Sequence, residues 1–272
     1  MRSKTIVIIG PTASGKTQLA IDIANKTGKN IVNCDSRQFW DQLSILSCAP
    51  TEEELKQAPH FLFNCLPINE KPSLGWWINN IQSISDKILV GGNVFYILSL
   101  LKGVPIFSVA LTTLEKIKNI SEPYNYLKEN NFNISNISIN DHYRINRALE
   151  FFLETGCTSF DQYEYKYTES LEIIFLKPNL SDLINNIHYR TQLILDQSIE
   201  EVKITDYHPN CDSIIGYSEI KQYLSNQINY QELHDLICLR TFQYSKKQIK
   251  FMRNLEKVYK DLNFQFSTFN ID

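Results

Sequence analysis

The segment Gly10–Thr17 constrains the fold of this chain more than any other part of its sequence. It reads Gly-Pro-Thr-Ala-Ser-Gly-Lys-Thr and matches the pattern G-x-x-x-x-G-K-[ST] in full. An apolar, β-branched run precedes it at Thr5–Ile9, and Gln18–Lys26 follows with apolar residues at helical spacing and Gly28 as a stop. A loop that joins a buried strand to a helix in this way is typical of α/β proteins that bind phosphate groups.

Each residue type in this loop has a physical role in holding phosphate. Glycines allow the backbone to wrap closely, so that successive N–H groups and the helix N-terminus face phosphate oxygens. Lys16 would place a positive charge on the outer phosphate, and the Thr17 hydroxyl would bind Mg²⁺. We therefore predict a phosphate site formed by Gly10, Pro11, Thr12, Ala13, Ser14, Gly15, Lys16 and Thr17.

Strands and helices alternate along much of the remaining chain. Apolar runs predict strands at Asn30–Cys34, Lys87–Val90 and Glu172–Leu176, and Tyr96–Leu101 is expected to be a short helix. The alternation predicts an α/β protein with a P-loop NTPase-like, doubly wound parallel sheet. Beyond residue 178 the pattern indicates helices to the end of the chain.

The segment 108–170 differs in character from the rest. It shows no clear strand, and it contains an amphipathic helix, Asp141–Thr155, with Gly156 as its stop. We therefore expect a core domain formed by residues 1–107 and 171–272, interrupted by a small helical insertion domain over 108–170.

Composition excludes several classes of protein. The formal net charge is −3 and the pI about 6.0, which argues against bulk attraction of nucleic acid but allows a local basic patch. The six cysteines form no C-x-x-C pair, and none stands near a pair of histidines in the sequence, so neither disulfides nor a zinc site are expected. No signal peptide pattern and no run of 18 apolar residues is present. These features predict a cytoplasmic protein without membrane contact.

Asp35 follows the second predicted strand, at the sheet edge where ligands of parallel sheets bind. Its carboxylate could hold Mg²⁺ through water, or it could act as a general base on a nucleophile. It could also simply cap a following helix. Position alone leaves these three interpretations open.

Basic residues recur at helical spacing in two places. Lys246, Lys250, Arg253 and Lys257 form one stripe that could follow a phosphate backbone or could be an ordinary solvated helix face. Arg144 and Arg147 share a helix face, which could equally be paired with nearby glutamates.

Several further motifs accompany the phosphate loop in a fixed order. They are Asp35-Ser36-Arg37-Gln38, Pro59-His60, Val90-Gly91-Gly92 with Tyr96, Arg144-Ile-Asn-Arg147-Ala-Leu-Glu150, Gly216-Tyr217 and Gln243-Tyr244-Ser-Lys246-Lys247-Gln248. In this order and spacing the set resembles the tRNA dimethylallyltransferase family, also called isopentenyl-tRNA transferases. The resemblance covers nearly the whole chain, from Thr5 to Leu255.

The resemblance implies transfer of a dimethylallyl group from dimethylallyl diphosphate to N6 of the adenosine just 3′ of the tRNA anticodon. The phosphate loop would then hold the leaving diphosphate, with Mg²⁺ as cofactor. The target base would leave its stack to reach the site. The partner would be the anticodon stem-loop, whose stem the helical insertion would contact, and we expect a monomer.

The resemblance also assigns residues. It implies that Asp35 takes the proton from the adenine amine and that Lys16, Thr17 and Asn93 belong to the catalytic centre. It implies tRNA contacts by Asp35, Ser36, Arg37, Gln38, Asn93, Tyr143, Arg144, Arg147, Lys246, Lys247, Gln248, Lys250 and Arg253.

The sequence departs from the family pattern at several positions. Asn93 stands where the family has threonine, and the segment Leu46–Pro50 lacks the family's lysine. Ser218 and Phe242 each stand where the family has arginine. These losses of positive charge bear on activity and tRNA affinity more than on fold.

Two other functions share part of this evidence. A P-loop kinase of a small metabolite or nucleotide would use the same loop and place Asp35 on Mg²⁺, but it gives no role to the basic C-terminal helix. A tRNA-binding protein with weakened or lost catalysis would explain Asn93, Ser218 and Phe242, but not the intact loop.

Overall fold

The computed structural model describes residues 4–70, 72–103, 105, 107–162, 170–261 and 267–271. The chain divides into two compact units, which are considered separately: Met1–Ile97 with Glu169–Asp272, and Leu98–Thr168.

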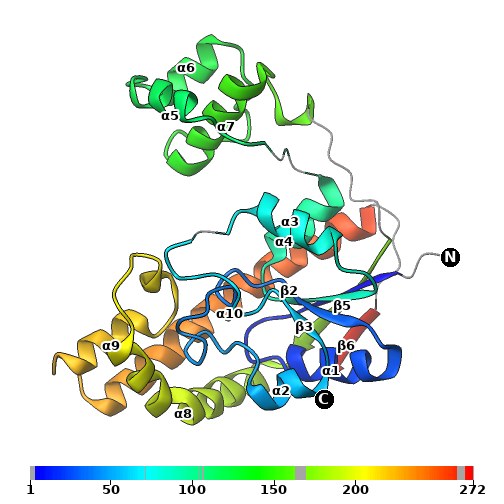
Figure 1. Cartoon of the computed structure of the whole chain (residues 1–272), viewed down its shortest axis with the longest axis vertical. Coiled ribbons are helices and arrows are strands. Elements are labelled where there is room, and N and C mark those ends of the chain that lie inside the picture. Colours follow the sequence, from blue (N-terminus) through cyan, green and yellow to red (C-terminus); the bar gives the residue numbers. More distant parts are fainter. Residues whose placement is uncertain are drawn as a thin grey trace. The chain divides into compact units, whose positions relative to one another are not determined.

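The first unit is built on one sheet of six strands, β3-β2-β4-β1-β5-β6, in which every pair is parallel (Figure 1). The strands are β1 (Thr5–Ile9), β2 (Asn30–Asn33), β3 (His60–Phe61), β4 (Lys87–Gly91), β5 (Leu171–Pro178) and β6 (Ser267–Ile271). This order confirms the predicted doubly wound α/β fold, because β1 has neighbours reached by crossovers in both directions.

Two strands were not predicted. β3 has only two residues, which is too short for a periodic signal. β6 contradicts the expectation that the chain is helical from residue 178 to its end. The β6 segment acquires a sheet partner by lying beside β5, with Ile174 opposite Ser267, and this pairing cannot be read from local sequence.

The helices of the first unit connect these strands. They are α1 (Lys16–Thr27), α2 (Glu52–Gln57), α3 (Leu74–Gln82), α8 (Leu180–Ile204), α9 (Tyr217–Leu224) and α10 (Tyr230–Asp261), and α4 (Val94–Lys102) begins in this unit. α1 ends where predicted, since Gly28 adopts φ 70° and its N–H bonds to Ala24. α8 and α10 run side by side (Figure 1).

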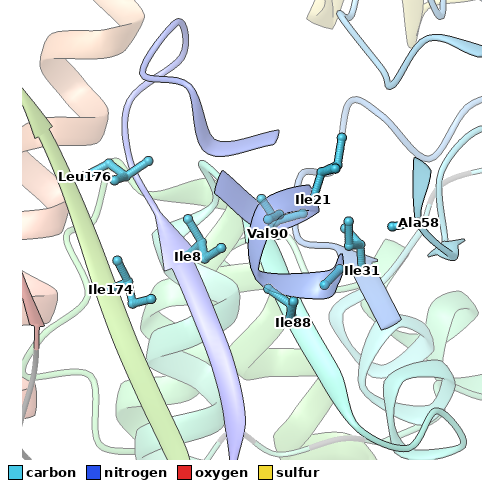
Figure 2. Close-up of a cluster of buried hydrophobic side chains, with 10 residues drawn as sticks. Ile8, Ile21, Ile31, Ala58, Ile88, Val90, Ile174 and Leu176 are labelled. Carbon is cyan, nitrogen blue, oxygen red and sulfur yellow. The ribbon is translucent and has the colours of Figure 1, made fainter. Parts of the chain in front are cut away.

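The hydrophobic core anchors α1 on one face of the sheet. Figure 2 shows Ile21 of α1 lying over the side chains of Ile8, Ile31 and Val90 on three neighbouring strands. In these parallel strands, Ile8 is paired in register with Val90 on one side and with Ile174 on the other. Burial of these branched side chains fixes the helix, and therefore fixes its N-terminus beside the carboxyl end of β1.

The second unit is helical among its described residues. It contains α5 (Leu111–Lys118), α6 (Pro123–Glu129), α7 (His142–Thr155) and the short 3₁₀ helix η1 (Phe160–Gln162). Asp141 lies just outside α7, where its side chain accepts a hydrogen bond from the Arg144 N–H, and Gly156 ends the helix at φ 69°. Leu127, Phe132 and Phe151 lie in a separate core of this unit.

Among the described helices, none combines the length and the apolar composition that crossing a bilayer requires.

Candidate functional site

The phosphate loop closes tightly between β1 and α1. Ala13 and Gly15 adopt positive φ values of 62° and 76°, which turns the loop back toward the helix start. A Cβ on Gly10 would lie 2.6 Å from Ser14 Oγ, so a side chain there would clash. The backbone of the loop therefore curves tightly between β1 and the start of α1, as the sequence predicts.

Polar groups in the loop lack partners within the described structure. Ser14 is buried, and its Oγ has no hydrogen bond to any described residue. The first N–H groups of α1 have no acceptor inside the helix. Such unpaired donors beside a helix N-terminus favour an anion.

Lys16 lies over the loop. Its Nζ donates to the Pro11 carbonyl at 2.6 Å. Burial lowers the pKa of Lys16 to about 8; the charge of Asp35 acts in the opposite direction, and the charge of Arg190 lowers the pKa further. The charges of Asp35 and Arg190 thus both act on Lys16, although the three residues come from separate parts of the chain.

Sequence reasoning missed Arg190, which lies on α8. The Arg190 Nε is buried and has no hydrogen-bond partner among the described residues. On the same helix, Asn186 donates from Nδ2 to the Ala13 carbonyl at 3.2 Å, so α8 contacts the phosphate loop. A second cation beside Lys16 increases the attraction for an anion. No local motif marks Arg190, because its role depends on the packing of α8.

Asp35 lies two residues after β2 at the carboxyl edge of the sheet. Its N–H bonds to the Asn33 side chain at 2.7 Å, and its Oδ1 accepts from the Arg37 N–H at 3.0 Å. The carboxylate therefore caps a turn, and no helix begins directly after it, which excludes the helix-capping interpretation. Within the described residues, the hydrogen bond of this turn uses Oδ1 of the carboxylate.

The segment after β4 approaches Asp35 closely. A Cβ on Gly91 would lie 2.2 Å from the Cys34 carbonyl oxygen, so only glycine fits there. The Asn93 N–H bonds to the same carbonyl at 3.3 Å. Asn93 and Asp35 are thereby held next to the same residue, Cys34, and the Asn93 side chain is half-exposed.

Gln248 of α10 joins two parts of the site. Its Oε1 accepts from the Thr12 N–H at 2.8 Å, and its Nε2 donates to the Gly92 carbonyl at 3.3 Å. Gln248 is 4% exposed. This placement does not fit the expected direct contact with tRNA, because the amide is already used inside the protein.

Tyr244, one turn before Gln248, also faces the site. Burial raises the pKa of the Tyr244 phenol well above its usual range, the Asp35 charge raises it further, and the Arg37 charge lowers it. The charges of Asp35 and Arg37 therefore both act on the Tyr244 hydroxyl, although the residue as a whole is 36% exposed.

The residues after Asp35 have different environments. Arg37 is exposed, with its guanidinium 5.8 Å from the centre of the Trp40 ring. Gln38 instead donates to the carbonyls of Ser47 and Cys48, at 3.2 and 2.6 Å. Gln38 therefore holds the neighbouring loop in place, whereas the side chains of Ser36 and Arg37 make no hydrogen bond to a described residue.

The basic stripe on α10 is exposed. Lys246, Lys247, Lys250 and Arg253 are all exposed, whereas Thr241, Ser245, Met252 and Leu255 on the same helix are buried. In the described part of the chain none of these four cations has an ion-pair partner, and Lys246 lies 5.4 Å from the centre of the Phe242 ring. The charges are thus available to a partner.

In the second unit, the predicted tRNA contacts lie on α7. Tyr143 is 75% exposed, and Arg144 is exposed with an ion pair to Asp141 at 3.3 Å. Arg147 pairs with Glu150 at 2.5 Å and lies over the Phe107 ring at 4.1 Å. The glutamate pairing considered from sequence is therefore present for Arg147, whereas Arg144 is exposed but paired with Asp141 and Tyr143 is exposed.

The structure brings one cysteine close to two histidines, an arrangement that the sequence alone does not indicate. His188, His234 and Cys238 place their ligand atoms within 4.8 Å of one another. The cysteine does stand near a pair of histidines, because α8 brings His188 against α10. The signal within α10 was the four-residue spacing of His234 and Cys238, which puts both on one helix face.

The sequence of this chain matches known protein families over most of its length. The model of the family described as IPP transferase matches residues 38–255, and that of isopentenyl transferase matches residues 3–67. A tRNA dimethylallyltransferase of Pelagibacter ubique is 33% identical, over 93% of this chain and 89% of its own length. Another, from Gloeothece citriformis, is 32% identical over 95% and 91%.

Solved structures agree on the fold. A eukaryotic dimethylallyltransferase captured while acting on tRNA superposes with a TM-score of 0.82 at 23% identity, covering 98% of this chain and 74% of that one. A tRNA isopentenylpyrophosphate transferase from Staphylococcus epidermidis gives 0.64, also at 23% identity, covering 98% and 93%.

Proposed function

This chain belongs to the IPP transferase family, and we infer from that membership that it is a tRNA dimethylallyltransferase, a prenyltransferase that modifies tRNA. The observation that carries the proposal is the phosphate loop with its buried, unpaired Ser14 Oγ, together with the buried, unpaired Nε of Arg190 and the charges of Arg190 and Asp35 that both act on Lys16. The cations Lys16 and Arg190 suit the binding of a leaving diphosphate, and the Asp35 carboxylate suits the acceptance of a proton from the attacking amine.

The acceptor that we propose is N6 of the adenosine at position 37, directly 3′ of the anticodon, and the product is N6-isopentenyladenosine. The donor is dimethylallyl diphosphate. A flipped adenine is the chemically reasonable form of the acceptor, because the amine cannot reach a loop at the sheet edge while its base is stacked.

The chemistry divides between the two sides of the site. The allylic C–O bond breaks and its electron pair leaves with the diphosphate, whose growing charge Lys16, Arg190 and the loop N–H groups stabilise. The adenine nitrogen forms the new C–N bond, and Asp35 accepts the proton that this nitrogen loses. We expect Tyr244 and Asn93 to orient the amine beside Asp35, because the Asp35 charge acts on the Tyr244 hydroxyl and the Asn93 N–H bonds to the carbonyl of Cys34, the residue before Asp35.

The residues present fit a magnesium ion. Mg²⁺ prefers oxygen ligands, and the loop offers the Thr17 hydroxyl and the unpaired, buried Ser14 Oγ. Thr17 would hold the ion together with diphosphate oxygens. When bound, Mg²⁺ would neutralise part of the leaving-group charge.

In the first unit, the proposed tRNA contacts are Asp35, Ser36, Arg37 and Asn93 at the site and the exposed cations of α10. In the second unit, they are Tyr143 and Arg144 on α7. Exposed cations contact phosphates without reading sequence, so the cations of α10 and Arg144, which would exchange its ion pair with Asp141 for a phosphate, would position the RNA. Contact of the helical unit with the anticodon stem, a monomeric state and a cytoplasmic location remain predictions.

A transfer assay tests the proposal. Purified protein is mixed with Mg²⁺, radiolabelled dimethylallyl diphosphate and unmodified tRNA carrying adenosine 3′ of the anticodon. We expect label in this tRNA and none when that adenosine is replaced by guanosine. Absence of label, with the diphosphate still bound, would favour a tRNA-binding protein that has lost catalysis; binding of ATP in preference to the allylic diphosphate would favour a kinase.

The same assay tests Asp35. Asp35→Asn removes the proton acceptor at nearly constant shape and should slow transfer by about 10²–10⁴-fold while dimethylallyl diphosphate still binds. Asp41→Asn, at an exposed carboxylate nearby, is the matched control. Transfer by Asp35→Asn at the rate of this control would exclude Asp35 as the base.

A further inference from the structure

Three metal-ligand side chains meet at the contact between α8 and α10, outside the machinery proposed above. The ligand atoms of His188, His234 and Cys238 all lie within 4.8 Å of one another. Their burial is graded, from buried Cys238 through half-buried His234 to exposed His188. The cluster is therefore anchored in the protein on one side and open to an incoming ion on the other.

The His234 ring is held in an orientation that suits metal binding. Its Nδ1 lies 3.1 Å from Asp235 Oδ1, and its Nε2 lies 3.7 Å from Cys238 Sγ. When Nδ1–H donates to the carboxylate, Nε2 keeps its lone pair and faces the thiol. A carboxylate behind a histidine is the arrangement that fixes the ring and tautomer of metal-binding histidines.

The donor set selects the kind of ion. Two imidazole nitrogens and one thiolate suit Zn²⁺ and similar transition metals, whereas Mg²⁺ and Ca²⁺ prefer oxygen. Bond lengths in tetrahedral zinc sites put neighbouring donors about 3.5 Å apart, close to the observed separation of His234 and Cys238. The exposed His188 has the freedom to make the remaining approach by rotating its side chain.

The surroundings show what such an ion would connect. His188, Asp235 and Cys238 line one surface pocket together with Ile184, Leu239 and Phe242. Cys238 also packs with Leu183 and Ile187 in a cluster that includes Ala13 of the phosphate loop. The cluster lies at the junction of the two helices that contact this loop through Asn186 and Gln248.

We propose that His188, His234 and Cys238 form a binding site for one Zn²⁺-class ion, with Asp235 as the residue that orients His234 and with water in the fourth position. The ion links α8 to α10 behind the phosphate loop. This site is separate from the Mg²⁺ site expected at Thr17, and its occupancy can be measured without assaying catalysis.

Cobalt binding tests the site directly. Full-length protein freed of metal by a chelator is titrated with Co²⁺, and we expect one equivalent to give the sulfur-to-cobalt charge-transfer band and the visible bands of tetrahedral Co²⁺. Added Zn²⁺ should remove these bands. His188→Gln and Cys238→Ser should each weaken binding at least tenfold, and Asp235→Asn about tenfold.

The controls are Cys65→Ser and His142→Gln, both exposed and outside the cluster. Cobalt bands that survive in Cys238→Ser, or that vanish in Cys65→Ser, would overturn the proposal, as would the absence of any band. Because His188 is exposed, His188→Gln should fold even if Cys238→Ser does not. Zn²⁺ should raise the melting temperature of the parent protein and not that of His188→Gln, and equal shifts would also refute the site.

Discussion

At the scale of single residues, the site depends on charges whose environments differ sharply. Desolvation and the charge of Arg190 lower the pKa of the half-buried Lys16, and the charge of Asp35 acts in the opposite direction. Gln248 satisfies two backbone groups from segments far apart in sequence. Substitution of Lys16 should therefore change the pH dependence of donor binding, and substitution of Gln248 should change the stability of the first unit.

The lowered pKa of Lys16 predicts a pH dependence of donor binding. Below about pH 8 the ammonium is charged in the free protein and binds the diphosphate; above it, a proton must first be taken up. The Kd for dimethylallyl diphosphate should be flat below about pH 8 and rise toward tenfold per pH unit above it. Calorimetric titration without tRNA measures this, since a phosphate ester has already lost its last proton near pH 6.

Lys16→Arg provides the comparison for this measurement. Arginine keeps its charge throughout this range, so whatever affinity the variant has should not change between pH 7 and about 9.5. A parent protein whose affinity is equally constant above pH 8 would contradict the titration of Lys16.

Gln248→Met should destabilise the first unit. The substitution keeps the volume but leaves the Thr12 N–H and the Gly92 carbonyl without their partner, at a cost of about 1–3 kcal/mol in the free energy of unfolding. Urea denaturation measures this cost. Gln243→Met, at an exposed position of the same helix, should have little effect, and equal costs for the two variants would show that the link is unimportant.

At the scale of elements, α10 has two faces with different tasks. Its buried face contributes Gln248 to the site and Tyr259, whose hydroxyl donates to the Leu171 carbonyl at the start of β5. Its exposed face carries Lys246, Lys250 and Arg253. The helical period separates these sets, so one element both completes the phosphate loop and offers charge to an RNA backbone.

The triple change of Lys246, Lys250 and Arg253 to alanine tests this exposed face. Each lost phosphate contact should reduce the slope of log K against log salt by about 0.7–0.9, so tRNA binding should weaken and the slope should fall by about 2–3. Filter binding at several salt concentrations measures both. Alanine at Lys26, Lys56 and Lys203 removes the same charge elsewhere, and a slope change no larger than this control would mean that α10 is a solvated face.

At the scale of the whole molecule, each of the two units has a hydrophobic core among its described residues. The sheet and its helices bury one, and the helical unit over Leu98–Thr168 buries another around Phe151. Every group proposed to hold the diphosphate belongs to the first unit. Donor binding and the stability of the helical unit should therefore be separable.

Phe151→Ala tests this separation. Loss of a fully buried ring should cost the helical unit about 3–5 kcal/mol, and proteolysis should then cut preferentially within residues 98–168. The affinity for dimethylallyl diphosphate should stay unchanged. Asn146→Ala, exposed on the same helix, is the control, and loss of donor binding in Phe151→Ala would show that the units depend on each other.

The sequence alone determined those features whose causes are local. The run from Thr5 to Thr17 specifies strand, loop and helix start, because hydrogen bonding and side-chain period act within a few residues. Gly28 and Gly156 end their helices as predicted, since each adopts the left-handed conformation that glycine allows. The family motifs then placed Asp35 and Asn93, which the structure holds beside the same residue, Cys34.

Only the tertiary structure decided which distant residues meet. The charge of Arg190 acts on Lys16, Gln248 accepts a hydrogen bond from the Thr12 N–H, and His188 lies close to Cys238. Helix packing brings these positions together, although no local sequence period connects them. The edge strand β6 has the same cause, since it exists only through its pairing with β5. Such contacts depend on how whole faces of helices and sheets are buried, and that burial is a property of the folded chain rather than of any segment.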